Sequence, residues 1–158
     1  MGDLAPMHEW RFYIEIPPDT IARLCAGIES ITENVNSQNK QYFFLCQKGT
    51  AVNSVNGIAP QYTVSGRRVY GDEAQEYIAG LKYKFGKERE TVFHMEREVL
   101  NRATGNTVIT QIEGLCTIMD ISDIGGSTTD NVPFSFTIAF NGKPSMQTII
   151  VPPIPDVP

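Results

Sequence analysis

The sequence is poor in the residues that metal sites and disulfide frameworks need. Its 158 residues include only three cysteines and two histidines. Cys25, Cys46 and Cys116 are odd in number, widely spaced and free of any CxxC pair, which predicts reduced thiols instead of disulfides or a zinc site. His8 and His94 stand in no HExxH or similar spacing. We therefore expect neither a metal nor a cofactor.

Long apolar runs and an excess of basic residues are absent as well. No stretch approaches the roughly 18 consecutive apolar residues of a membrane-spanning helix, and the first ten residues lack the basic segment and apolar run of a secretory signal. The chain carries 13 Lys and Arg against 18 Asp and Glu, a net charge of -5, which is no footprint for tight binding to duplex DNA. We expect a protein that folds in the cytoplasm and does not bind a membrane.

A recognisable catalytic set is also missing. Glu96, Glu98 and Glu113 are the best candidates for an acid and base set, yet Glu96 and Glu98 lie two apart on a predicted strand and so share a face. The loop at Gly125 and Gly126 lacks the lysine of a phosphate-binding GxxxxGK[ST] motif. Without a nucleophile, base and orienting group, we expect no catalytic residues and no enzyme activity.

Alternation of apolar and polar side chains with period two predicts a mainly β protein. A length of 158 residues with 41% hydrophobic residues suits one globular domain. The pattern predicts strands at 10–16, 28–35, 61–66, 90–100, 108–120 and 132–141. The expected fold is all-β, a β-sandwich or small barrel.

One helix is expected beside this sheet. Asp72 has the residue type of an N-cap, and Gln75 follows three residues later as in a capping box. Tyr77, Ile78 and Leu81 then recur at helical spacing and give the helix a single apolar face. The helix should therefore flank the sheet instead of being buried.

Two segments fall outside this pattern. Residues 34–60 form a long, turn-rich loop between two strands, and such loops in compact domains tend to be functional. From Gly142 the periodicity fades and the chain ends in VPPIPDVP, whose prolines favour an extended conformation without ladder donors. We expect a single domain at 1–141 and an extended C-terminal arm at 142–158.

Three segments resemble the major tail (tail-tube) protein family of siphophages that infect Gram-positive hosts. They are YFFLCQKGTA at 42–51, VNGIAPQYTVSGRRVYGDEAQEYIAG at 55–80, and VITQIEGLCTIMDISDIGGSTTDNVPFSFTIAFNGKPS at 108–145. The resemblance lies in their order: an aromatic run, a strand and turn before a helix start, and a glycine-rich loop leading into a strand closed by Gly-x-Pro. The first 27 residues match less well.

The resemblance implies a β-sandwich subunit that forms hexameric rings whose inner sheets join into one barrel. The rings would stack into a tube around a tape-measure protein and later pass DNA. It places the protein in the tail of a virion assembled in host cytoplasm, with itself, the tape-measure protein and other tail proteins as partners. Two alternatives stay open: another tail ring protein (a contractile-tail tube or a terminator), and a monomeric β-sandwich module with Trp10 and Tyr62 stacking on a sugar or small ligand.

The resemblance also implies that the long loop and the terminal arms bridge neighbouring rings. The polar part of the loop and the apolar side chains of the arm are the candidates for inter-ring contacts: Asn36, Ser37, Gln38, Asn39, Lys40, Gln41, Met146, Ile149, Ile150, Val151 and Ile154.

A conduit for DNA should have an acidic lumen, because a basic lining would retain the polyanion. Residues 106–158 carry five acids against one base, a bias that also suits a merely solubilising surface. Our lumen candidates are Glu96, Glu98 and Glu113, with Gln111, Thr117, Ser135 and Thr137 as neutral companions. Strand parity alone does not say which wet face would line the channel.

Overall fold

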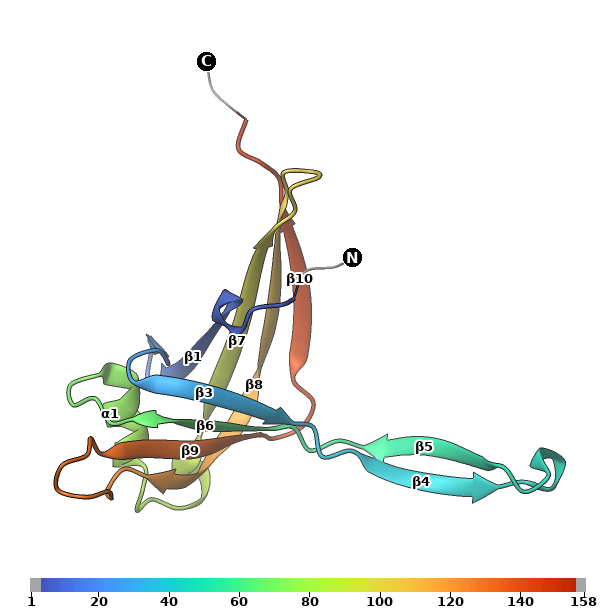
Figure 1. Ribbon diagram of the computed structural model, residues 1–158, viewed down its shortest axis with the longest axis horizontal. Helices are drawn as coiled ribbons and strands as arrows, with labels where there is room; N and C mark the ends of the chain where they lie inside the picture. Colours follow the sequence, from blue (N-terminus) through green and yellow to red (C-terminus); the bar gives the residue numbers. More distant parts are fainter. Residues whose placement is uncertain (1–3, 156–158) are drawn as a thin grey trace.

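The computed structural model describes residues 4–155, which fold mainly into antiparallel β-structure with one α-helix (Figure 1). The strands are β1 (Trp10–Ile16), β2 (Thr20–Arg23), β3 (Ile28–Asn34), β4 (Gln38–Phe43), β5 (Ala51–Gly57), β6 (Gln61–Arg67), β7 (Glu90–Leu100), β8 (Thr107–Ser122), β9 (Pro133–Phe140) and β10 (Ser145–Val151). The helical elements are α1 (Glu73–Gly80) and the 3-10 turns η1 (Met7–Glu9), η2 (Leu45–Gln47) and η3 (Gly86–Arg89). The expectation of a mainly β fold with one helix is confirmed.

Eight strands form one continuous sheet in the order β2-β1-β7-β8-β9-β6-β3, with β10 also paired to β8. The 16-residue length of β8 makes this possible. One side of β8 pairs with β7, whereas on the other side β10 pairs with residues 107–113 and β9 with residues 116–122. In Figure 1, β7, β8 and β10 run up the view and β3, β6 and β9 run across it.

The hydrophobic core lies where these two parts of the sheet cross. The alternating side chains of β9 supply Phe134, Phe136 and Ile138, all almost completely buried. Tyr62 on β6 packs against Phe93 on β7, a strand with which β6 does not pair, at 5.8 Å between ring centroids. The sheet is therefore folded over itself like a sandwich, and burial of these aromatic side chains stabilises the two layers.

The helix is fixed to the sheet by a buried polar side chain. Asp72 caps α1 by accepting a hydrogen bond from the backbone N–H of Gln75 at 3.1 Å, as the sequence predicted. The side chain of Gln75 is fully buried and does not complete a capping box. Its amide instead donates to the carbonyls of Ala26 (2.8 Å) and Arg67 (3.0 Å) and accepts from the N–H of Val69 (2.7 Å).

The loop expected at 34–60 is largely a β-hairpin. Strands β4 and β5 pair with each other, β4 is exposed along its whole length, and the hairpin projects away from the rest of the protein (Figure 1). The sequence did not indicate it because a ribbon that is exposed on both faces has no buried face and hence little alternation.

The expectation of a free C-terminal arm from Gly142 onward was wrong for the first half of that segment. Residues 145–151 form β10, which pairs with β8 along seven register positions. The prolines from residue 142 onward stand at 144, 152, 153, 155 and 158, so none interrupts the strand. Of the described residues, only 152–155 remain beyond the sheet, and the end of the expected arm at 156–158 lies outside the described residues.

Candidate assembly surfaces

The structure places the five lumen candidates of β7 and β8 on one face of the sheet, whereas Thr137 on β9 is buried and does not suit a wet wall. Directly opposed residues of antiparallel strands share a face, and the register pairs Glu96 with Gln111. Glu98 lies two residues further on β7, while Glu113 and Thr117 lie two and six residues further on β8, so all have the same parity. The core side chains of these strands point to the opposite face.

The same face continues over β1, β2 and β10. Arg11 opposes Glu96, Tyr13 opposes His94 and Arg23, and Gln147 opposes Gln111. The charged side chains on this surface, which we call the acidic face, are five carboxylates and two guanidinium groups: Glu15, Glu90, Glu96, Glu98, Glu113, Arg11 and Arg23. The acidic face therefore carries a net negative charge.

A histidine lies between two carboxylates on the acidic face. His94 Nε2 is 3.2 Å from Glu15 Oε1, and His94 Nδ1 is 3.0 Å from Glu113 Oε2. Arg11 lies 3.6 Å from Glu98, with both side chains nearly half exposed. Such exposed ion pairs are screened by water and add little stability. The arrangement gives a hydrated, charged surface with no nucleophile beside a base.

The candidate contact residues on β4 are exposed, but the large apolar side chains of the hairpin lie at a different place. Gln38 to Gln41 are exposed along β4, whereas Asn36 anchors the base of the hairpin by donating from its side chain to the carbonyl of Ala59 at 3.0 Å. Large apolar side chains gather at the far end, where Phe43, Phe44 and Leu45 are exposed by 66%, 52% and 102%. These three residues, which we call the hairpin tip, were visible in the sequence only as a short apolar run.

The C-terminal candidates are divided between the two faces of β10. Ile149 opposes Ile109 and Val151 opposes Thr107, which puts both on the acidic face. Met146 and Ile150 point to the opposite face and are exposed, and Ile154 lies beyond the strand. In residues 4–155, β10 has a strand neighbour on one side only, so its other edge presents unpaired backbone groups.

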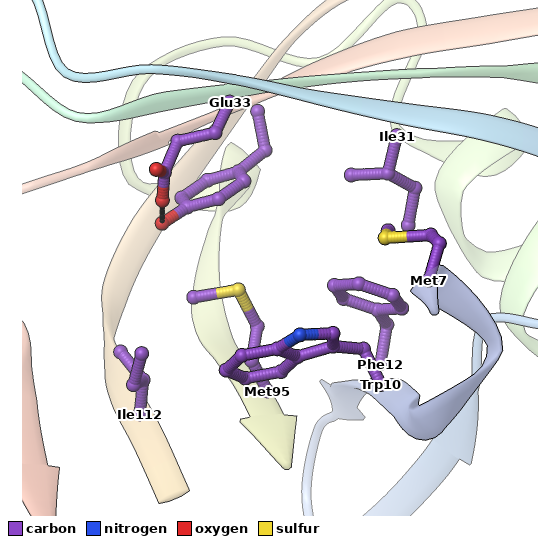
Figure 2. Close-up of a pocket in the computed structure, with 8 residues that line it drawn as sticks. Met7, Trp10, Phe12, Ile31, Glu33, Met95 and Ile112 are labelled. Atoms are coloured by element: carbon purple, nitrogen blue, oxygen red, sulfur yellow. Dashed lines mark hydrogen bonds between the residues drawn. The ribbon is translucent and has the colours of Figure 1, made fainter. Parts of the chain in front are cut away.

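An apolar groove opens between the two layers beside η1 (Figure 2). We call this pocket the groove. It has a volume of about 230 Å³ and is lined by Met7, Trp10, Phe12, Ile31, Glu33, Tyr62, Met95 and Ile112. These residues come from five strands and η1, so no local sequence signal indicated the groove.

The groove contains both residues that the ligand-binding alternative named. Trp10 and Tyr62 line it, but Tyr62 is buried and its ring contacts Phe93 and Phe140. Its hydroxyl donates to the Glu33 carboxylate, shown as a dashed line in Figure 2. Burial and this neighbouring carboxylate raise the pKa of Tyr62 well above its ordinary value. Tyr62 therefore offers no free aromatic face on which a sugar could stack.

No family model matches the sequence, and no curated protein matches it. Solved structures do. A chain from the tail of an empty gene transfer agent (GTA) particle, with C6 symmetry, superposes with a TM-score of 0.67 at 14% identity, covering 91% of this chain and 99% of the other. A chain of the SPP1 tail tube gives 0.62 at 16% identity, covering 94% and 80%. The chain has the tail-tube fold.

A third structure of the same fold comes from a different machine. A chain of the sheath/tube terminator of PVC, an extracellular contractile injection system, superposes with a TM-score of 0.58 at 10% identity, covering 92% of this chain and 98% of the other. The tail-tube fold thus extends over more than nine-tenths of the chain. At these identities the likeness shows the fold, and the siphophage type and a Gram-positive host stay expectations.

Two further observations concern metal binding and membrane spanning. In the part of the chain that the structure describes, no group of three or more His, Cys, Asp or Glu residues is arranged to hold a metal ion. Over the same residues, no helix has the length and apolar character needed to span a bilayer.

Proposed function

We propose that this protein is a structural, non-catalytic subunit of a phage tail tube, built from stacked hexameric rings that conduct DNA. The observation that carries the proposal is the match of 91% of the chain to almost the entire length of a GTA tail chain in a C6-symmetric assembly. On this proposal the protein belongs to the virion tail, after assembly in the host cytoplasm.

The free edge of β10 supports ring formation. An exposed strand edge invites pairing with another chain, and natural proteins protect such edges or close them in an oligomer. Here β10 carries no proline between residues 145 and 151 and has large apolar side chains, including Ile149 and Ile150. Pairing of this edge with the next subunit, repeated around a ring, would leave no open edge at that position.

The acidic face supports a role as a conduit. In a six-fold ring each inward-pointing carboxylate is repeated around the channel, so Glu96, Glu98 and Glu113 would form three rings of negative charge. DNA carries one negative charge about every 1.7 Å of axis and would not adhere to such a wall. We assign this face to the lumen, where it would first surround a tape-measure protein and later the passing DNA.

The hairpin supports contacts beyond one ring. It extends away from the domain and, among the described residues, its strands pair only with each other (Figure 1). A two-stranded hairpin is marginally stable alone in water, so this one should be ordered by a neighbouring subunit. We propose that residues 34–60 and 152–155 make inter-ring contacts, and that other tail proteins close the ends of the tube.

A second candidate function within the same fold is a ring that terminates a tube. The likeness to the PVC sheath/tube terminator favours it, since that chain is matched over 98% of its length. The two functions differ in what the purified protein builds. A tube subunit polymerises into long stacks, whereas a terminator stops at one ring.

Negative-stain electron microscopy of the purified, concentrated protein separates these functions. We expect hollow tubes whose length grows with concentration. Single rings would favour the terminator. A monomer that persists at every concentration and binds a sugar or small ligand would contradict the proposal and favour a ligand-binding module.

A further inference from the structure

We propose that the groove receives the hairpin tip of another copy of this chain, with Leu45 as the inserted side chain. The inference rests on the proposed self-assembly and specifies the surface that the hairpin contacts. Neither the sequence resemblance nor the fold comparisons assign an occupant to the groove.

The hairpin tip has the character of an inserted segment. Leu45 is completely exposed, and Phe44 next to it stacks on Tyr42 with ring centroids 6.0 Å apart. An apolar cluster of this kind on a projecting ribbon is costly to leave in water and marks an interaction site. The η2 turn presents the cluster at the end of the hairpin farthest from the sheet (Figure 1).

The geometry requires that a second copy supply the tip. The hairpin leaves the domain at residues 34 and 61 and runs outward, whereas the groove lies between β1, β3 and β7 beside the N-terminal turn (Figures 1 and 2). The hairpin tip therefore cannot fold back into the groove of its own subunit. Inter-subunit insertion satisfies both surfaces at once, and symmetry repeats the contact for every copy.

The groove matches the hairpin tip in size and chemistry. Its cavity of about 230 Å³ is smaller than the roughly 300 Å³ at which small-molecule pockets begin, so it suits one or two side chains better than a ligand. Seven of its eight lining residues are apolar or aromatic. Figure 2 shows Trp10, Phe12 and Met95 along one side, and Ile31 and Glu33 on the other.

The charges of the hairpin and of the groove also support the hairpin tip as the occupant. The hairpin from residue 38 to 57 carries Lys40 and Lys48 and no acidic residue, in a chain whose net charge is -5. Among residues 4–155, Glu33 is the only charged residue that lines the groove. A lysine beside the inserted tip would therefore meet a carboxylate, a complementarity that fixes orientation more than affinity. The competing occupant, Ile154, lies in a segment whose described residues carry no charge to pair with Glu33.

Photo-crosslinking of the full-length protein tests the contact. A benzophenone amino acid replaces Leu45 in one variant and Phe85, an equally apolar residue exposed by 84%, in a control. After assembly and irradiation, mass spectrometry identifies the joined peptides. We expect position 45 to cross-link to residues 7–12 or 31–33 of another copy, and position 85 not to do so. Cross-links from position 45 only to other segments, or none in tubes that do form, overturn the inference.

Charge substitutions give an independent readout. Leu45→Lys and Met7→Glu, each at an exposed position, should raise the critical concentration for assembly roughly tenfold or more, as expected for loss of one buried leucine or methionine contact. The double variant should recover part of this loss, and Phe85→Lys should assemble like the wild type. Circular dichroism confirms that each subunit is folded. Normal assembly of Leu45→Lys overturns the inference, whereas wild-type protein that never assembles overturns the proposed function and the inference with it.

Discussion

Replacing Gln75 should destabilise the subunit far more than replacing an exposed residue of α1. Gln75 is fully buried, and its amide bonds to three backbone groups, of Ala26, Arg67 and Val69, and also accepts a hydrogen bond from Arg68 Nη1 at 3.4 Å. Gln75→Ala leaves those three backbone groups without their partner in a place that is closed to water. An unsatisfied buried group costs about 1–3 kcal/mol, so even the low end of this range gives a total near 3 kcal/mol.

Thermal unfolding of the unassembled subunit measures this loss. About 3 kcal/mol is a large part of the roughly 5–15 kcal/mol that a domain has, and should lower the Tm by roughly 6–12 °C for a chain of this size. Glu73→Ala, on the exposed side of the same helix, is the matched control and should change the free energy of unfolding by less than about 0.5 kcal/mol. A Gln75→Ala variant as stable as this control would refute the role assigned to Gln75.

Gln75→Glu adds a pH signature. The new carboxylate would face two carbonyl oxygens in a buried site, so its folded pKa would be raised above the unfolded value. Stability gained from the protonated form is present below the unfolded pKa and is lost as pH rises through the folded pKa. The variant should therefore approach the wild-type Tm at acidic pH and fall behind it at neutral pH. A pH-independent difference would show that the side chain is not enclosed.

Three further outcomes follow from the same structure. The carboxylate of Glu76 accepts hydrogen bonds from the Gly71 N–H and from Arg68, and these bonds lower the pKa of Glu76. The contribution of Glu76 to stability is therefore lost as the pH falls through that lowered pKa. The variant Glu76→Gln should flatten the acid limb of a plot of Tm against pH. Deletion of residues 145–158 should lower the Tm of the subunit as well as prevent assembly, because β10 belongs to the sheet; an unchanged Tm would contradict the pairing with β8. Alkylation at pH 8 should modify the two exposed cysteines and spare Cys116, whose pKa burial raises to about 12; mass spectrometry of native protein that showed rapid labelling of Cys116 would contradict its burial.

The sequence predicted those parts of the fold in which one face is buried. The strands from Trp10 and from Glu90 match the structure at both ends, and the helix begins after Asp72 as expected. In these elements the core imposes a period of two or 3.6 on the side chains, and that period is visible without coordinates.

The missed elements share a different property. The hairpin at 38–57 and the short strand β2 are largely exposed, so nothing forces an alternation on them. Strand β10 was hidden by the prolines that follow it, since VPPIPDVP suggested an unpaired arm from Gly142 onward. Pairing with the first half of β8 depends on the unusual length of that strand, which only the three-dimensional arrangement shows.

The candidate surfaces divide in the same way. Parity along one strand predicted that Glu96 and Glu98 share a face, and the structure has them so. That Glu113, Gln111 and Thr117 lie on the same face depends on the register between β7 and β8, which the sequence did not predict, and their place in a lumen stays a prediction. The groove was not predictable, since its lining comes from residues 7 to 112 and depends on how the sheet folds over itself. The hairpin tip was visible as an apolar run, but its exposure was not.

Cryo-electron microscopy with helical reconstruction of the assembled protein tests the central claim most directly. The account predicts a hollow, six-fold tube in which Glu96, Glu98 and Glu113 point into the channel and give it a negative potential. A tube with these residues on its outer wall, or with a positive channel, would contradict the conduit argument. A purified protein that forms no tube under any condition would contradict the proposed function itself.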